Sequence, residues 1–363
     1  MTSARPRRTA PALLAAAGVA LIAAGCASAP QQMVYQGGSE AGNGRVWPAG
    51  PSGEVPRYRY VGELTGETNF RSEGDPGAGS LLQRAFEIIV GLAEKIVAPT
   101  VLQRPQGGYT DDSGRVYVTD VSRKAVFVFD PAAGRLLVWD EPAPGERFGT
   151  PVALAPGRAG ELLVTDSDRG EVFRLATDGR PIGRFGKGVL GRPTGVARDP
   201  AAGRVYVGDV QHRTVHVFDD DGRAVGTLGD PADGATLNAP VHLAFASGML
   251  YVVDGLEARV VVLGEDGKLR ATIGKRGLYV GNLVRPKGVA VDDEGNVYVV
   301  ESMYDRLLVF DAEGRLLVAI GGTGRDIGRF YLPAGVWVDA RNRVYVADMF
   351  NGRVVVFQFL GGS

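Results

Sequence analysis

The chain has 363 residues, of which 45% are apolar, 22% charged and 8% aromatic, and its formal net charge is −1. This apolar content suits a large core and excludes a disordered protein, and the balanced charge gives no net attraction to nucleic acid. The single cysteine excludes a disulfide framework, a CxxC redox pair and a cysteine-based zinc site, and three histidines leave few ligands for a metal centre. The 53 glycines, about 15% of the chain, indicate many tight turns.

Residues 1–25 have the pattern of a secretory signal, with three arginines ahead of an apolar core. The core has about 16 residues, which is short for a membrane span of roughly 20. Ala-Ala-Gly then precedes Cys26 and resembles the lipobox of bacterial lipoproteins. The resemblance implies a lipid anchor on Cys26, and Ala27 favours the outer membrane. Residues 26–56, rich in Gly, Pro, Ser and Gln, are expected to form a flexible tether.

Six units repeat along the rest of the chain, and each opens with a proline. These prolines lie 42 to 47 residues apart, at Pro105, Pro151, Pro193, Pro240, Pro286 and Pro333. An acidic residue that ends a β-rich run keeps the same period, at Asp120, Asp166, Asp209, Asp254, Glu301 and Asp348. Two independent markers with one period indicate a repeat architecture.

The fifth unit shows the internal pattern of a repeat. Alternating β-branched and apolar residues predict four strands, at Gly288–Val291, Asn296–Val300, Arg306–Phe310 and Arg315–Ile320. Turns rich in Asp and Gly separate them. Four antiparallel strands in 40 to 50 residues are typical of a propeller blade.

The sixth unit ends after its third strand, Arg353–Phe359, and Arg57–Leu64 resembles the missing fourth strand. We therefore expect the N-terminal strand to complete the last blade, which leaves no open sheet edge. The prediction is an all-β protein, a single six-bladed β-propeller of four-stranded antiparallel blades over residues 57–363. It would be a monomer.

The last unit also carries a family signature. Asp348, Asn351 and Arg353 with the following Val-x-Val-Phe resemble the NHL repeat, Asp-x-x-Asn-x-Arg-Val-x-Val-Phe. Units four and five match more loosely through Arg259 and Arg306, and units one to three depart at that position. The resemblance implies an NHL-like six-bladed propeller. It does not name an activity, because binding proteins, lyases and hydrolases share this fold.

One segment does not repeat. Leu81–Val97 has an apolar stripe at helical spacing and predicts an inserted helix within residues 80–98. Two interpretations remain open: the helix packs over the propeller, or it docks a partner or a membrane surface.

The meander of strands places the start of each first strand and each loop between strands two and three on one face. We call it the proline face, after the six prolines above, and the opposite face the turn face. Besides the six acidic residues, its candidates for contact with a ligand or partner are Arg104, Arg192, Arg285, His242, Tyr304 and Phe350.

Each kind of candidate has two interpretations. The acidic residues suit hydrogen bonds to loop amides or pairing with an Arg five residues on, and the repetition favours this structural role. The three arginines form an anion-binding rim or are ordinary surface residues. His242 replaces a glycine found in four other units, so we expect its side chain near the channel mouth, as a lining residue or as a ligand or base.

No metal or cofactor is expected. Propeller lyases related to NHL repeats hold a metal with histidines from several blades, whereas His212 and His216 share unit three and cannot complete such a set with His242. Asp219–Gly222 matches the hairpin turns of other units and lacks the spaced Glu of a calcium loop. The sequence contains no P-loop, GxSxG or CxxCH.

These features favour a non-catalytic, membrane-tethered propeller that binds a protein or polymer partner in the cell envelope. The alternative is a propeller lyase or lactonase-like hydrolase with a metal-assisted site at the channel mouth, where His242 and carboxylates would hold the metal.

Overall fold

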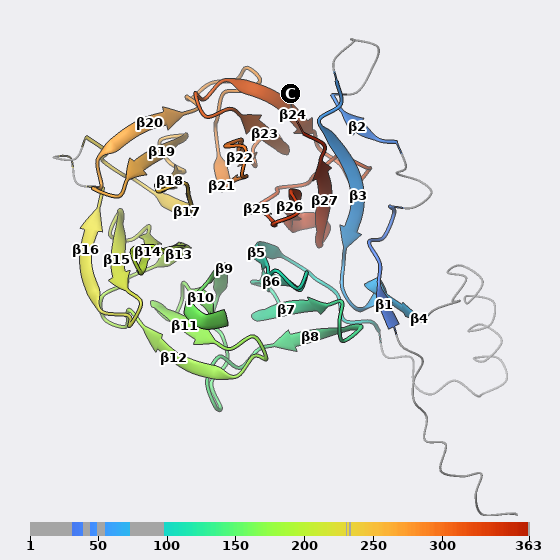
Figure 1. Ribbon diagram of the computed structural model, residues 1–363, viewed down its shortest axis with the longest axis horizontal. Helices are drawn as coiled ribbons and strands as arrows, with labels where there is room; N and C mark the ends of the chain where they lie inside the picture. Colours follow the sequence, from blue (N-terminus) through green and yellow to red (C-terminus); the bar gives the residue numbers. More distant parts are fainter. Residues whose placement is uncertain are drawn as a thin grey trace, which may run out of the picture.

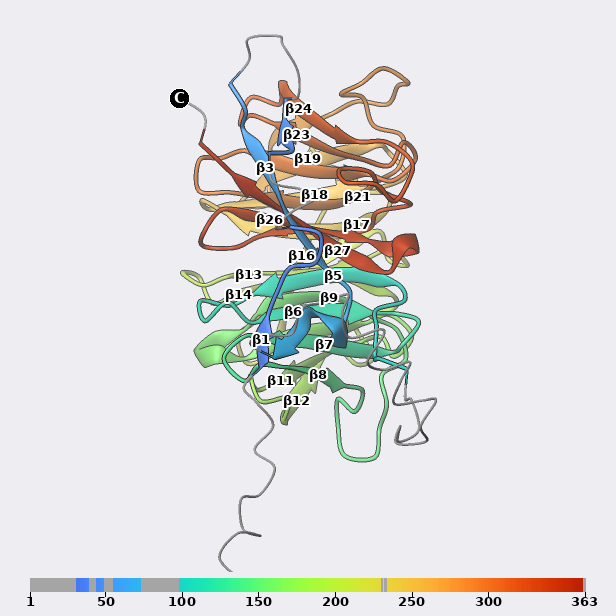
Figure 2. The same ribbon diagram turned by 90° about the vertical axis from the view of Figure 1, so that its right-hand side faces the viewer.

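The computed structural model describes residues 31–38, 44–48, 55–72, 98–229, 231 and 234–361. They form a six-bladed β-propeller (Figure 1), whose disc is seen edge-on in Figure 2. The predicted signal with Cys26 and residues 80–97 of the predicted helix lie outside the described residues. None of the helices in the described ranges is long and apolar enough to span a membrane.

Blades one to five are four-stranded antiparallel sheets. Blade one has β5 (Pro105–Thr110), β6 (Val116–Asp120), β7 (Ala125–Asp130) and β8 (Arg135–Trp139). Blade two has β9 (Pro151–Pro156), β10 (Leu162–Asp166), β11 (Glu171–Leu175) and β12 (Pro181–Phe185). Blade three has β13 (Pro193–Asp199), β14 (Arg204–Asp209), β15 (Thr214–Asp219) and β16 (Ala224–Leu228). Blade four has β17 (Pro240–Ala246), β18 (Met249–Asp254), β19 (Arg259–Gly264) and β20 (Leu269–Ile273). Blade five has β21 (Pro286–Val291), β22 (Val297–Glu301), β23 (Arg306–Phe310) and β24 (Leu316–Gly321).

Blade six confirms the predicted closure by the N-terminal strand. It consists of β25 (Val336–Val338), β26 (Arg343–Asp348) and β27 (Arg353–Phe359), followed in space by β3 (Tyr58–Leu64). The pairing of β27 with β3 is antiparallel and runs from Val354 opposite Leu64 to Phe359 opposite Tyr58 (Figure 1). The two ends of the propeller are thus joined by a sheet. Within the described residues, short 3₁₀ turns accompany the strands: η1 (Glu67–Asn69), η3 (Arg158–Gly160) and η5 (Met349–Asn351).

The structure differs from the predicted tether over residues 26–56 at two places. β1 (Gln31–Met33) pairs with β4 (Phe70–Ser72), and β2 (Val46–Trp47) adds a fifth strand to blade six beside β3. The Trp47 ring packs edge-on against Phe357, with 5.3 Å between centroids. A composition rich in Gly and Pro predicts a flexible segment and does not reveal these contacts. One aromatic side chain that packs on the propeller is enough to hold a short strand.

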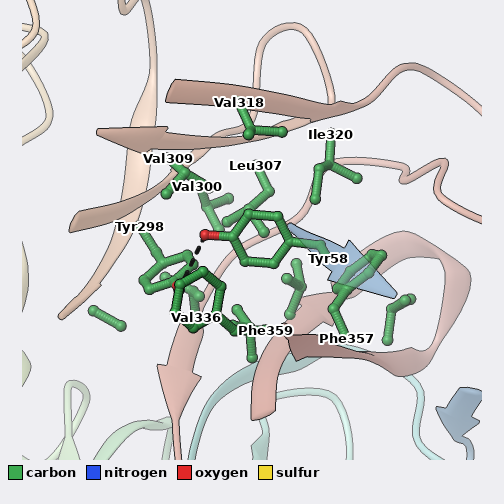
Figure 3. Packing of buried hydrophobic residues seen from close by; sticks show 14 of the residues in the cluster. Tyr58, Tyr298, Val300, Leu307, Val309, Val318, Ile320, Val336, Phe357 and Phe359 are labelled. Carbon is green, nitrogen blue, oxygen red and sulfur yellow. Dashed lines mark hydrogen bonds between the residues drawn. The ribbon is translucent and has the colours of Figure 1, made fainter. Parts of the chain in front are cut away.

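The core lies between neighbouring blades. Figure 3 shows the cluster between blades five and six, to which the N-terminal strand contributes Tyr58. The Tyr58 hydroxyl donates a hydrogen bond to the Tyr298 hydroxyl at 3.2 Å. Strands two and three of each blade are buried on both faces, which explains their nearly continuous apolar sequences.

The first strands line the central channel and approach one another closely. At Gly335, a Cβ atom would overlap the carbonyl oxygen of Gln106 in blade one, so only glycine fits. Beside it, the Trp337 indole donates a hydrogen bond to Thr110 Oγ1 at 3.0 Å. These contacts close the ring between blades six and one.

Candidate functional site

The six acidic residues that end the second strand of each blade, here called the blade acids, are buried. They accept hydrogen bonds from the loops of the proline face. In blade one, Asp120 Oδ2 accepts hydrogen bonds from the backbone N–H groups of Gln103 and Arg104, at 2.6 and 2.9 Å. In blade five, Glu301 accepts the corresponding bonds from Val284 and Arg285. Such bonds satisfy buried amides of the loop before each first strand, which is a structural role.

Blade six adds a buried guanidinium to this arrangement. Arg353 Nε lies 2.8 Å from Asp348 Oδ2, and its Nη1 lies 2.6 Å from Glu63 Oε2 on the N-terminal strand. Burial raises the pKa of Asp348 even though Arg353 and backbone N–H groups oppose the shift. Asp348 and Arg353, two residues of the NHL-like pattern, thus join the last blade to the N-terminal strand.

The three candidate arginines, Arg104, Arg192 and Arg285, have exposed side chains on the proline face, while their backbone N–H groups bond to the blade acids. The Arg104 guanidinium lies over the Phe350 ring, 5.0 Å from its centroid. Tyr304 has a similar neighbour, with Arg306 5.8 Å from its centroid. The structure brings Arg104 and Phe350 together, on the first and last blades.

Phe350 belongs to a larger set of exposed apolar side chains that the sequence analysis missed. They lie on the proline-face loops of blades four to six: Leu256, Leu278, Tyr279, Val280, Met303, Tyr331 and Phe350. Leu278 and Tyr279 are 78% and 84% exposed. The Tyr331 and Phe350 rings pack edge to face at 5.6 Å. The sequence does carry a signal for this set, because large apolar residues occur in segments that are predicted to be loops.

His242 lies in the channel. A cavity of about 200 Å³ is lined by the first strands of all six blades, and His242 and Gly107 lie at its end nearest the proline face. His242 is the third residue of β17, and the cavity extends from its level along the first strands towards the turn face. Its Nδ1 accepts a hydrogen bond from the Val289 N–H at 3.3 Å, and burial lowers its pKa to about 4. The ring is therefore neutral at pH 7.

The cavity lining does not fit a metal held by His242 and carboxylates. Besides His242, the lining is mostly Gly, Ala, Val, Leu and aromatic residues, and it contains neither Asp nor Glu. Its one charged residue, Arg198, is paired with Asp220 at 2.7 Å. A divalent cation bound here would lack the anionic ligands that compensate its charge.

A second group of polar side chains lies in blade three. Asp209 Oδ2 is 2.8 Å from His212 Nδ1 and 3.6 Å from His216 Nε2. Burial raises the pKa of Asp209, but the nearby His216 ring and the backbone N–H groups of Gly191, Arg192 and His212 outweigh it and lower the pKa well below its usual value. The sequence alone placed both histidines in unit three but did not predict their contact with Asp209. Their shared neighbour is the blade acid.

Residues 104–322 match the family model described as the SMP-30/gluconolactonase/LRE-like region. This match ends before blade six, where the NHL-like signature lies. No curated protein matches the sequence.

Several solved structures are similar. An auxiliary nutrient binding protein from Bacteroides thetaiotaomicron is 14% identical with a TM-score of 0.57, over 72% of this chain and 70% of that one. A gluconolactonase from Xanthomonas campestris is 16% identical with a TM-score of 0.54, over 72% and 89%. Virginiamycin B lyase from Staphylococcus aureus is 14% identical with a TM-score of 0.52, over 71% and 96%.

At such identities the similar structures show the fold alone, which hosts both binding proteins and enzymes. The family model matches more than half of the sequence, and so the chain belongs to the SMP-30/gluconolactonase/LRE-like family.

Proposed function

We propose that this chain is a non-catalytic binding propeller that holds a protein partner of the cell envelope on its proline face. The observation that carries the proposal is the set of exposed apolar and aromatic side chains over blades four to six, from Leu256 to Phe350. Soluble proteins rarely leave large apolar side chains exposed on several neighbouring loops unless that surface contacts another molecule.

The composition of this surface suits a protein partner. Tyr331 and Phe350 pack against each other, and Arg104 covers the Phe350 ring. Aromatic residues and arginine are enriched where protein interfaces derive most of their affinity. The loops project from a rigid ring of sheets, so little conformational entropy is lost on binding.

The location is the second part of the proposal. We infer that Cys26 carries a lipid that anchors the mature chain in the outer membrane. The support is the signal pattern of residues 1–25 and the small residues before Cys26. Two or three acyl chains give stable anchoring, because each buried CH₂ contributes about 0.8 kcal/mol.

Site-specific crosslinking in intact envelopes tests the binding face. A photo-crosslinking residue at Tyr279 or Phe350 should capture one abundant protein, whereas the same residue at Glu313, on the turn face of blade five, should not. The double variant Tyr331→Ser, Phe350→Ser should reduce that capture at least tenfold. Equal capture from Glu313, or a polysaccharide in place of a protein, would overturn the proposed partner.

The family match and the fold shared with a lyase and a gluconolactonase keep an enzymatic function as the second candidate. Its site would be the channel cavity, where neutral His242, with its Nδ1 held by the Val289 N–H, would offer Nε2–H to a substrate as a hydrogen-bond donor. Lactone hydrolysis by the purified chain, measured with and without added Ca²⁺ or Zn²⁺, tests this function. Turnover that His242→Ala abolishes would favour the enzyme over the binding protein.

A further inference from the structure

We propose that Asp209, His212 and His216 form a binding site for a transition-metal ion of the zinc class on the proline face of blade three. Asp209 ends β14, His212 lies in the loop that follows, and His216 lies on β15. The three candidate ligand atoms are Asp209 Oδ2, His212 Nδ1 and His216 Nε2. Each residue offers a ligand atom that lies within 4.8 Å of those of the other two.

The spacing suits a small ion. Asp209 Oδ2 is 2.8 Å from His212 Nδ1 and 3.6 Å from His216 Nε2. Tetrahedral ligands at about 2.05 Å from Zn²⁺ lie roughly 3.4 Å apart, between these two distances. The His212 side chain is 45% exposed, so its ring has room to adjust and solvent reaches this side of the site.

The burial of His216 is an independent observation. The residue seven places after the blade acid is apolar and buried in the other five blades: Phe127, Phe173, Val261, Leu308 and Val355. His216 occupies the same core position and is only 9% exposed, yet its Nε2 has no hydrogen-bond partner among the described residues. An unsatisfied buried nitrogen destabilises the fold, and a bond to a metal ion would remove that penalty.

The carboxylate is already held in place. Asp209 Oδ2 accepts a hydrogen bond from the Gly191 N–H at 2.7 Å, and Oδ1 accepts bonds from Arg192 and Gln211. These backbone contacts orient the carboxylate as outer partners orient metal ligands. Two imidazoles with one carboxylate favour Zn²⁺, Co²⁺, Ni²⁺ or Cu²⁺ over Ca²⁺ and Mg²⁺, which prefer oxygen ligands.

The other blades supply substitutions that the fold tolerates. His216→Leu places in blade three the residue that blade five has at Leu308, and His212→Asn places there the residue that blade six has at Asn351. Both variants should fold, since Leu is close to His in volume, the His212 side chain is partly exposed and neither change adds charge to the core. His242→Gln is the matched control, because it removes the one other histidine.

The test is metal binding by the untagged chain after removal of metals with a chelator. Co²⁺ should give the visible absorption of a tetrahedral site at one ion per chain, and Zn²⁺ should displace it. We expect His216→Leu and His212→Asn each to weaken Zn²⁺ binding at least tenfold in calorimetry, and His242→Gln to bind as the unmodified chain does. No Co²⁺ or Zn²⁺ binding by the folded chain, or unchanged binding by His216→Leu, would refute the site.

Discussion

The substitution Arg353→Met removes the buried guanidinium that joins the N-terminal strand to the last blade. Arg353 contacts Asp348 through Nε at 2.8 Å and Glu63 through Nη1 at 2.6 Å, and its Nη2 donates to the Arg329 carbonyl at 2.9 Å. Met keeps most of the side chain's apolar volume. The loss of stability therefore reports the charge and its hydrogen bonds.

The expected loss of unfolding free energy depends on the hydrogen bonds and hydration that Asp348 and Glu63 retain without Arg353. Breaking a buried ion pair by removing one partner costs about 3–5 kcal/mol. Asp348 retains hydrogen bonds from the Tyr331 N–H and the Asn351 amide, and Glu63 is exposed enough to be rehydrated. We therefore expect the lower end of that range, about 3 kcal/mol of unfolding free energy.

The pH dependence gives a second readout. Burial raises the pKa of Asp348 in the folded chain, and without Arg353 this pKa rises further. As the pH falls through that raised pKa, the folded variant takes up a proton before the unfolded chain does, which stabilises it. The difference in unfolding free energy between the variant and the unmodified chain should thus become smaller from pH 8 towards acid pH.

Urea unfolding followed by far-UV circular dichroism measures both effects. Arg259→Met is the matched control, because Arg259 occupies the same repeat position in blade four but is 31% exposed and lies 3.5 Å from Asp254. Arg259→Met should lower the unfolding free energy by about 1 kcal/mol or less. Equal losses in the two variants, or a loss at Arg353 that does not change with pH, would refute the reasoning.

Three further substitutions test the channel, the ring closure and the anchor. Gly335→Ala should destabilise the propeller by about 1–3 kcal/mol in the same assay, since a Cβ there meets the Gln106 backbone, whereas Gly183→Ala, which meets open space, should not. His242 has a folded pKa of about 4, so the unmodified chain should lose up to about 3 kcal/mol between pH 6.5 and 4, and His242→Gln should remove that part of the loss. An NMR titration that places the folded pKa near 6.5 would contradict this. Cys26→Ser should release the chain from the membrane fraction and abolish lipid attachment in mass spectrometry; continued membrane association would place the anchor elsewhere.

The sequence by itself determined the architecture. Prolines and acids with one period predicted six blades, and the missing strand after Phe359 predicted closure by Arg57–Leu64. Local sequence signals are enough to predict this fold, because each blade is a meander of neighbouring strands. Its turns and its alternation of side chains all lie within about 45 consecutive residues. The same period marked the blade acids as structural, since a residue that recurs in every blade serves the fold.

Only the tertiary structure decided which side chains meet. Asp209 and His216 lie on the neighbouring strands β14 and β15, and their side chains meet only in the folded blade. The position of His242 in the cavity depends on how closely the six first strands approach one another. The packing of Trp47 on Phe357 joins residues far apart in the chain. Strand alternation specifies a face of a sheet, whereas distances between blades depend on the twist of each sheet and on the volumes packed between them.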